Sequence, residues 1–262
     1  MPEHDNKVAI VTGGAQGIGY AVAERLLRDG ARVVIADIND KAGISAAKVL
    51  SEYGSVDYVH CDVGDRLDVN NLVASTLEEF GDIDILVNNA GIIQDANFLE
   101  LSEEDFDRVL TVNLKGAFLT SQAVGRHMVE KVNQGAVAGT IVNISSVNAI
   151  FAVADQVAYS VSKGGLNQLT KVSALALAEY GIRVNAVGPG SIMTPMLSTL
   201  NDDPAAKKRI LSRTPLGRVG DPDEMAAIVS FLASNDASYI TGQTLYADGG
   251  RLGLNFTVEP PE

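Results

Sequence analysis

The sequence predicts an α/β protein in which about seven parallel strands form a doubly wound sheet with helices on both faces. Short segments rich in β-branched residues alternate with longer segments of helical periodicity along all 262 residues. The short segments are apolar at most positions, which is typical of parallel strands that helices cover on both sides. No linker, repeat or low-complexity stretch interrupts the alternation, so we expect one domain spanning residues 1–262.

The expected strands begin with KVAIVT and RVVIAD and end with QTLYADGG. Together they cover residues 7–12, 32–37, 56–62, 83–89, 139–145, 182–188 and 243–250. Between them, apolar residues at three- and four-residue spacing predict helices, each with a glycine near its end. The clearest helices cover residues 19–30, 67–81 and 166–181. Such strand–helix–strand units are joined by right-handed crossovers.

A long connection, residues 189–218, follows the sixth strand and contains prolines and a helical middle. Ligands bind beyond the carboxyl ends of the strands in sheets of this kind. We therefore expect a lid over a pocket near residues 191–213. A surface excursion with no gating role is the alternative.

Composition disfavours several classes of function. The formal net charge of −13 repels nucleic acid and anionic membranes at long range. Three scattered histidines and a single cysteine, Cys61, offer neither metal-ligand spacing nor an internal disulfide. We see no signal-peptide pattern at the start, and no apolar run approaches the roughly 18 residues of a membrane span. We expect a cytoplasmic protein with no bound metal and no nucleic-acid or membrane partner.

A glycine-rich turn, VTGGAQGIG, follows the first strand and opens the first helix. It contains Gly13, Gly17 and Gly19, with Gln16 and Ile18 between them. The order differs from the G-x-G-x-x-G fingerprint, but the physics is shared. Glycines let the backbone approach a pyrophosphate, and the amino terminus of the helix offers free N–H groups. The turn therefore predicts a dinucleotide site.

An acidic residue, Asp37, ends the second strand and precedes Ile38. A carboxylate at this place accepts hydrogen bonds from an adenosine ribose and repels a 2′-phosphate. No arginine or lysine occupies the glycine turn or residues 38–40. The sequence therefore favours NAD over NADP. The alternative is that Asp37 caps the following helix.

Tyr159 and Lys163 stand four residues apart in AYSVSKGGL. On a helix this spacing puts both side chains on one face, so a phenol and an ammonium can meet. Two unrelated surface side chains have the same spacing, so the pair is weak evidence alone. The other motifs of the chain decide between these interpretations.

Those motifs resemble the short-chain dehydrogenase/reductases. The resemblance rests on the glycine turn, CDV at 61–63, NNAG at 88–91, Asn113, ISS at 144–146, Tyr159 with Lys163, and PGSIMT at 189–194. It runs from the first strand to DGG at 248–250. It implies a Rossmann-like fold and an NAD-dependent oxidoreductase.

The resemblance implies four catalytic residues. Tyr159 would be the general acid/base, and Lys163, with an oxidised nicotinamide, would stabilise its phenolate, because a free phenol has a pKa of about 10. Ser146 would polarise the substrate carbonyl, while the adjacent Ser145 would be structural. Asn113 would support a proton-relay water, which would give its amide a task in a helix interior. An ordinary buried amide is the alternative for Asn113.

The resemblance also implies contacts with the whole length of the cofactor. Residues 62–63 would flank the adenine, residues 89–91 would lie beside the adenosine ribose, and residues 189–194 would hold the nicotinamide. The expected cofactor contacts are Gly13, Gln16, Gly17, Ile18, Gly19, Asp37, Ile38, Asp62, Val63, Asn89, Ala90, Gly91, Tyr159, Lys163, Pro189, Gly190, Ile192 and Thr194.

Side chains expected near Tyr159 mix apolar walls with a few polar groups. The candidate substrate contacts are Asn148, Phe151, Gln156, Met193 and Met196. Asn148 and Gln156 would bind hydroxyls of a sugar or polyol, or else bond to the backbone. We therefore expect hydride transfer between nicotinamide and a small secondary alcohol or ketone, the alcohol being a polyol, sugar or cyclic alcohol.

Two other functions compete with this one. A 3-oxoacyl thioester reductase of the acyl-carrier-protein type needs a local basic patch for an acidic carrier, such as KKRILSR at 207–213. Asp37 counts against it, as does Tyr180, where relatives that use a carrier often have a basic residue. A non-catalytic dinucleotide-binding protein would be favoured by a broken tetrad, but all four positions are filled.

The resemblance implies a homotetramer that assembles through helices near residues 105–131 and 156–180. The tail at 251–262 is apolar enough to dock. We expect it to reach a neighbouring subunit near the pocket.

Overall fold

The computed structural model describes residues 3–195, 197 and 203–259. Each expected strand is present, with small shifts at its ends. The strands are β1 (Val8–Thr12), β2 (Arg32–Asp37), β3 (Val56–His60), β4 (Ile85–Asn88), β5 (Thr140–Ile144), β6 (Arg183–Pro189) and β7 (Thr244–Ala247).

The strands form one parallel sheet in the order β3-β2-β1-β4-β5-β6-β7, which confirms the expected doubly wound α/β fold. Ala9 of β1 lies beside Val33 of β2 on one side and Ile85 of β4 on the other. The chain therefore moves outward in both directions from β1. The crevice beyond the carboxyl ends of β1 and β4 is the place where such sheets bind dinucleotides.

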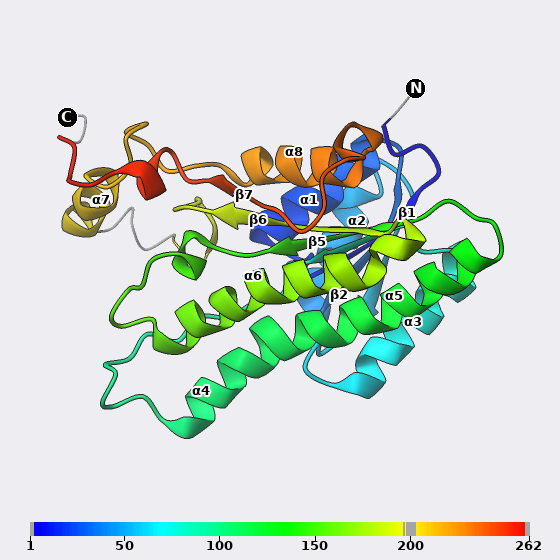
Figure 1. Cartoon of the computed structure of the whole chain (residues 1–262), viewed down its shortest axis with the longest axis horizontal. Coiled ribbons are helices and arrows are strands. Elements are labelled where there is room, and N and C mark those ends of the chain that lie inside the picture. The colour runs from blue at the N-terminus through cyan, green and yellow to red at the C-terminus, as the bar shows by residue number, and fades with distance from the viewer. Residues whose placement is uncertain (1–2, 196, 198–202, 260–262) are drawn as a thin grey trace.

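Helices cover both faces of the sheet, as Figure 1 shows. Helices α1 and α8 pack against each other on one face, while α3, α5 and α6 cover the opposite face. The described α-helices are α1 (Gly17–Arg28), α2 (Asp40–Leu50), α3 (Arg66–Phe80), α4 (Glu103–Leu110), α5 (Ala117–Asn133), α6 (Val157–Leu177), α7 (Pro204–Leu211) and α8 (Pro222–Ala233).

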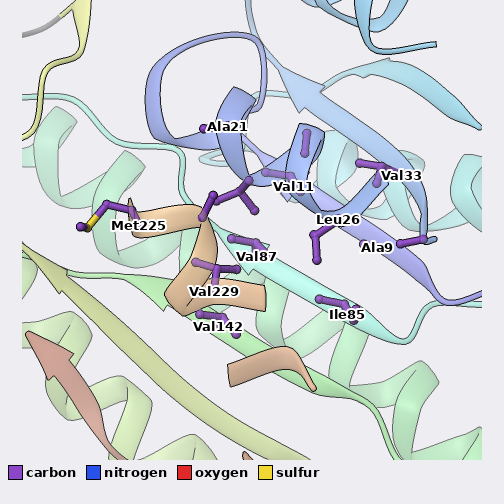
Figure 2. Close-up of a cluster of buried hydrophobic side chains, with 14 of the residues drawn as sticks. Ala9, Val11, Ala21, Leu26, Val33, Ile85, Val87, Val142, Met225 and Val229 are labelled. Carbon is purple, nitrogen blue, oxygen red and sulfur yellow. The ribbon is translucent and has the colours of Figure 1, made fainter. Parts of the chain in front are cut away.

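Two apolar layers hold the helices to the sheet. Alternation along β1 sends Val11 into one layer and Ile10 into the other. Figure 2 shows the first layer, where Leu26 of α1 and Val229 of α8 meet strand side chains such as Val87. Because both faces of the sheet are buried, the strands are apolar at successive positions. Burial of a side chain such as Leu26 contributes about 1.5–3 kcal/mol to folding.

The segment expected to form a lid contains α7. Asp203 caps this helix, since its side chain accepts hydrogen bonds from the backbone N–H groups of Ala205 and Ala206. Met196, one of the candidate substrate contacts, lies outside the described residues.

The carboxy-terminal tail lies beside α7 (Figure 1). The Val258 N–H donates to the Ser212 carbonyl of the same chain at 2.8 Å. This bond joins the tail to the end of α7 in its own chain, and the expectation that the tail reaches a neighbouring subunit stays a prediction.

The described part of the chain contains no helix that combines the length and the hydropathy of a membrane span.

Candidate functional site

The expected catalytic side chains converge at the carboxyl edge of the sheet, on a cavity of about 510 Å³. Its described lining comprises Ile18, Ile93, Val147, Asn148, Val153, Asp155, Gln156, Tyr159, Pro189, Gly190, Ser191, Ile192, Thr194, Leu197, Arg209, Ile210, Arg213 and Arg251. A second cavity of about 420 Å³, lined by residues of α8 and of 214–220, contains none of the expected catalytic residues. The first cavity is therefore the candidate active site.

Helix α6 brings Tyr159 and Lys163 together, as their spacing predicts. The Lys163 Nζ lies 5.5 Å from the centre of the Tyr159 ring and donates to the Ile144 carbonyl at 2.7 Å. Lys163 is only 4% exposed, and burial lowers the pKa of its ammonium to about 8. The two residues are thus a pair, Lys163 buried and Tyr159 half-buried, rather than two unrelated surface side chains.

The phenol of Tyr159 is held in its protonated form by its surroundings. Burial raises the pKa of Tyr159, and a hydrogen bond with the Ser146 side chain opposes this shift only in part. A protonated phenol suits donation of a proton to a carbonyl oxygen. The reverse reaction needs a further positive charge nearby to favour the phenolate.

Ser146 and Ser145 have different surroundings, although they are adjacent in the chain. Ser146 lies at the start of the short helix η2 (Val147–Ala149), where its hydroxyl accepts a hydrogen bond from the Asn148 N–H at 3.1 Å. The Ser145 hydroxyl donates instead to Asn167 Oδ1 at 2.6 Å. Ser146 is the serine that meets Tyr159, and Ser145 ties β5 to α6.

Asn113 lies in a π-helical turn, η1 (Thr111–Gly116), between α4 and α5. Its amide Nδ2 donates to the Ile92 carbonyl at 2.9 Å and to the Ser162 hydroxyl at 3.1 Å, and its Oδ1 accepts from the Ile92 N–H at 2.8 Å. Both amide hydrogens are therefore used within the protein. The amide joins η1 to residue 92 and to α6, and the expected support of a proton-relay water by Asn113 stays a prediction. The Ser162 hydroxyl continues this chain of bonds to the Tyr159 carbonyl.

The glycine turn is shaped for close backbone approach. Gly13 and Gly17 have positive φ angles of 61° and 58°, a conformation that side chains rarely adopt. A Cβ at Gly19 would overlap the Gly13 carbonyl oxygen and the Asn89 amide. Asn89 Nδ2 donates to the Thr12 and Gly13 carbonyls at 3.0 and 2.9 Å, so the loop after β4 fixes the glycine turn.

The Thr12 hydroxyl also fixes the loop after β4. It accepts from the N–H groups of Asn89 and Ala90 at 3.0 and 3.1 Å. Sequence reasoning missed Thr12, although a buried threonine directly before a glycine turn is a visible signal. Gly91, the next residue of the loop, approaches Asn113, because a Cβ there would lie 3.4 Å from Asn113 Oδ1.

Asp37 faces the glycine turn. Its Oδ2 accepts from the Ala15 N–H at 3.2 Å, and its Oδ1 accepts from the Asn39 N–H at 3.0 Å. The cap of α2 is Asn39, whose side chain accepts from the Ala42 N–H. The alternative that Asp37 caps this helix is therefore wrong. Gln16, at the start of α1, and Ile38, which is 62% exposed, flank the same edge.

Asp62 and Val63 follow β3. Asp62 Oδ1 accepts from the Gly64 N–H at 2.8 Å, so this carboxylate shapes its own loop. Val63 is buried, and a Cβ at Gly116 would come within 2.7 Å of it. The loop after β3 is thus packed against η1.

The segment after β6 lies across the glycine turn. Pro189, Gly190, Ile192 and Thr194 all line the cavity. A Cβ at Gly17 would lie 3.5 Å from the Thr194 methyl group, so residues 192–194 and the start of α1 enclose the crevice between them.

Only some of the candidate substrate contacts line the cavity. Asn148 and Gln156 line the cavity, and Asn148 Nδ2 donates to Gln156 Oε1 at 2.8 Å. Phe151 and Met193 are absent from the described lining, although the Phe151 ring lies beneath Arg251, which does line the cavity. Sequence reasoning missed Arg251 and placed the basic stretch at 207–213 only as a surface for a partner.

A buried polar network behind the site was also missed. Asn88 Nδ2 donates to Asn143 Oδ1 and to the Ser121 hydroxyl, both at 2.8 Å. Asn143 Nδ2 continues to the Thr170 hydroxyl at 2.9 Å. The network joins β4, β5, α5 and α6, and thus fixes α6, which carries Tyr159, to the centre of the sheet.

A doubly wound sheet with a glycine turn at its switch point, a Tyr–Lys pair and an adjacent serine defines the class of nicotinamide-dependent oxidoreductases. A family model described as enoyl-(acyl carrier protein) reductase matches residues 13–251. The chain belongs to the short-chain dehydrogenase/reductase family, as its motifs predicted.

Several relatives support this assignment. The chain is 42% identical over 247 residues to the 3-oxoacyl-(acyl-carrier-protein) reductase FabG of Thermotoga maritima, covering 94% of this chain and 98% of that protein. It is 41% identical over 250 residues to an L-rhamnose 1-dehydrogenase (NAD(P)(+)) of Azotobacter vinelandii, covering 94% and 96%. The crystal structure of levodione reductase superposes with a TM-score of 0.89 at 34% identity, covering 95% and 98%. These relatives differ in substrate, so they define the reaction class and leave the substrate open.

Proposed function

We propose that the protein transfers a hydride between a small secondary alcohol or its ketone and NAD, with Tyr159 as the general acid/base. The observation that carries the proposal is the Tyr159–Lys163 pair with Ser146 bonded to the phenol, which Tyr159 presents on the wall of the cavity. A polyol, sugar or cyclic alcohol fits a cavity of about 510 Å³ that mixes apolar and polar walls.

The residues around the crevice fit a nicotinamide dinucleotide. At Gly13 a Cβ would come within 2.8 Å of Ala90 Cα, and at Gly19 it would overlap the turn itself, so glycine leaves the space that a pyrophosphate needs. The start of α1 supplies free N–H groups for its charge. Pro189 to Thr194 would hold the nicotinamide end. When bound, the cofactor supplies or accepts the hydride.

The side chains of the cavity handle the proton. In the reducing direction, the protonated Tyr159 donates to the substrate oxygen, and the Ser146 hydroxyl stabilises the charge that develops there. In the oxidising direction, Tyr159 accepts the alcohol proton as phenolate. The Lys163 ammonium, close to the ring, lowers the cost of that phenolate.

Asp37 supports a preference for NAD. Its carboxylate faces the glycine turn at Ala15, where a 2′-phosphate on the adenosine ribose would meet a like charge. The Azotobacter relative carries NAD(P)(+) in its name, so the family members at this level of identity do not all choose one cofactor.

A second candidate is a 3-oxoacyl thioester reductase. The identity to the Thermotoga reductase favours it, and so do Arg209 and Arg213 at the cavity, which lie in the basic stretch that an acidic carrier would need. Asp37 disfavours the phosphorylated cofactor. Reduction of an acetoacetyl thioester with NADH and with NADPH distinguishes this candidate from the first.

We also propose a homotetramer that assembles through α5 and α6. Several large apolar side chains of these helices are exposed in the single chain, namely Phe118, Val161, Val172 and Leu175. Light scattering of the purified protein at micromolar concentration measures the assembly directly.

Substitution of Tyr159 by phenylalanine tests the reaction. We expect turnover of an active alcohol to fall about 100- to 10,000-fold, because the acid/base group is lost, while NADH affinity stays within about twofold. A panel of polyols, sugars and cyclic alcohols with NAD, followed at 340 nm, supplies the substrate. Tyr53→Phe is the matched control, because Tyr53 packs against Arg28 away from the cavity. Near-normal turnover by Tyr159→Phe would refute the assignment.

A further inference from the structure

The candidate active-site cavity carries a charge opposite to that of the chain. Three arginines, Arg209, Arg213 and Arg251, line it, and the only acidic residue among its described lining residues is Asp155. The chain as a whole has a net charge of −13. A local excess of arginine in an acidic protein marks a place where an anion binds.

Arg251 is the most constrained of the three arginines. Its guanidinium lies 4.6 Å above the centre of the Phe151 ring, and its Nη1 donates to the Ser191 hydroxyl at 3.5 Å. Burial lowers the pKa of Arg251, and the nearby Arg213 adds to this effect. Asp248 opposes it, but its carboxylate accepts hydrogen bonds from two backbone N–H groups, at Gly250 and Leu252.

A guanidinium has five N–H donors, and most of those on Arg251 have no acceptor within the described residues. Neither Arg251 nor Arg213 forms an ion pair there. Arg183 is another partly buried arginine, but its guanidinium donates to the Leu232 and Ser234 carbonyls at 2.7 and 2.9 Å. A partly desolvated cation without such acceptors is costly unless a ligand supplies them.

The fold holds these arginines in one place although they are far apart in the sequence. Arg213 follows α7, and Arg251 follows β7. The bond from Val258 N to the Ser212 carbonyl ties the tail to the end of α7, and Figure 1 shows the two segments side by side. Arg213, which is exposed, and Arg251, which is half-buried, therefore line the same cavity.

We propose that the substrate carries an anionic group, a carboxylate or a phosphate, that Arg213 and Arg251 bind beside Tyr159. The inference rests on the proposed reaction, since it names the class of substrate for the same cavity. Planar guanidinium groups bind carboxylates and phosphates with paired hydrogen bonds, each strengthened by charge. Phe151 supports Arg251 from below and so keeps its donors directed at the ligand.

The test compares charged substrates with neutral partners. Oxo acids are compared with their ethyl esters, which lack the carboxylate charge. Acetoacetyl-CoA is compared with the acetoacetyl thioester of N-acetylcysteamine, which lacks the phosphates. The measured quantity is the ratio of kcat/KM for each charged substrate to that for its neutral partner, with NADH. The variants are Arg213→Gln and Arg251→Gln, and the matched control is Lys208→Gln, whose side chain is on α7 but outside the cavity lining.

We expect the charged substrate to be preferred by the unmodified protein. Each arginine variant should lower that preference about 10- to 100-fold, and Lys208→Gln should leave it unchanged. A fall in the acid-to-ester ratio identifies a carboxylate as the bound group, and a fall only in the ratio of the two thioesters identifies a phosphate of coenzyme A. Equal ratios in all variants, or a loss confined to NADH affinity, would overturn the inference, the latter because the arginines would then serve the cofactor.

A binding measurement separates this inference from the proposed reaction. Calorimetric titration of succinate and of inorganic phosphate into the enzyme–NADH complex requires no turnover. Binding of either anion that the double variant Arg213→Gln/Arg251→Gln weakens at least about 10-fold supports the anion site even if the reaction proves different. Equal binding, or none, to both proteins would refute it.

Discussion

Substitution of Gly19 by alanine should damage both the fold and the cofactor site. The new Cβ would overlap the Gly13 carbonyl oxygen and the Asn89 amide, so the glycine turn and the loop after β4 must separate. Asn89 then loses hydrogen bonds of 3.0 and 2.9 Å to the Thr12 and Gly13 carbonyls. Two such bonds are worth about 1–3 kcal/mol, and overpacking costs about 1–3 kcal/mol more.

Alanine is the better helix former by about 1 kcal/mol, which offsets part of this loss at Gly19 in α1. The expected net destabilisation is therefore about 1–5 kcal/mol. The displaced turn also moves the N–H groups that would face the pyrophosphate, and we expect the Kd for NADH to rise at least about 10-fold. Urea unfolding followed by circular dichroism measures the first effect, and titration of NADH fluorescence measures the second.

Gly125→Ala is the matched control for Gly19→Ala. Gly125 is also a helical glycine, in α5, but a Cβ there would make only an ordinary contact of 3.8 Å with Leu177. Its substitution should leave NADH affinity unchanged and add up to about 1 kcal/mol of stability. If Gly19→Ala matches the unmodified protein in urea midpoint and in NADH affinity, the argument for a sterically required glycine fails.

Two further substitutions test charge. Asp37→Ala should lower the ratio of kcat/KM for NAD to that for NADP by about 10-fold or more, because a like charge next to the 2′-phosphate is removed; an unchanged ratio means that another group reads the ribose. His4→Gln should reduce the dependence of the free energy of unfolding on pH below about 6.5. Burial lowers the pKa of His4 below 6.5, although Asp29 and Glu3 oppose this, so the unfolded chain binds a proton that the folded chain does not. The contribution of neutral His4 to the free energy of unfolding is therefore fully present above pH 6.5 and is lost as the pH drops through the lowered pKa. Urea midpoints measured at about pH 7.5 and 5.5 should show this loss in the unmodified protein and not in His4→Gln.

Features that depend on residues close together in the sequence were predictable. The strands are continuous apolar runs because both faces of the sheet are buried, and the turn at Gly13 to Gly19 is visible because only glycine permits that approach. The spacing of Tyr159 and Lys163 likewise fixed their common face, since four residues make about one helical turn.

Features that depend on distant partners were not predictable. Lys131 reads as a surface residue of α5, yet it is buried and its Nζ donates to Asp82 and Asp84, which precede β4, at 2.8–2.9 Å. Burial alone would lower the pKa of Lys131, but these ion pairs raise it. The π-helical turn at Thr111–Gly116 was hidden as well, because the bonds of Asn113 to Ile92 and Ser162 become apparent only after folding.

The charges at the two ends of the candidate site bear on its selectivity for both cofactor and substrate. Asp37 places a negative charge beside the glycine turn, where the adenosine is expected, and the arginines place positive charge at the cavity that contains Tyr159. The negative charge of the whole chain is screened within about 8 Å in physiological salt, so it has little effect inside the cavity. The proposed anion site therefore predicts that an anionic substrate is repelled only weakly at a distance and is attracted beside Tyr159. Asp37 is expected to disfavour the phosphorylated cofactor at the other end, because a 2′-phosphate there would meet a like charge.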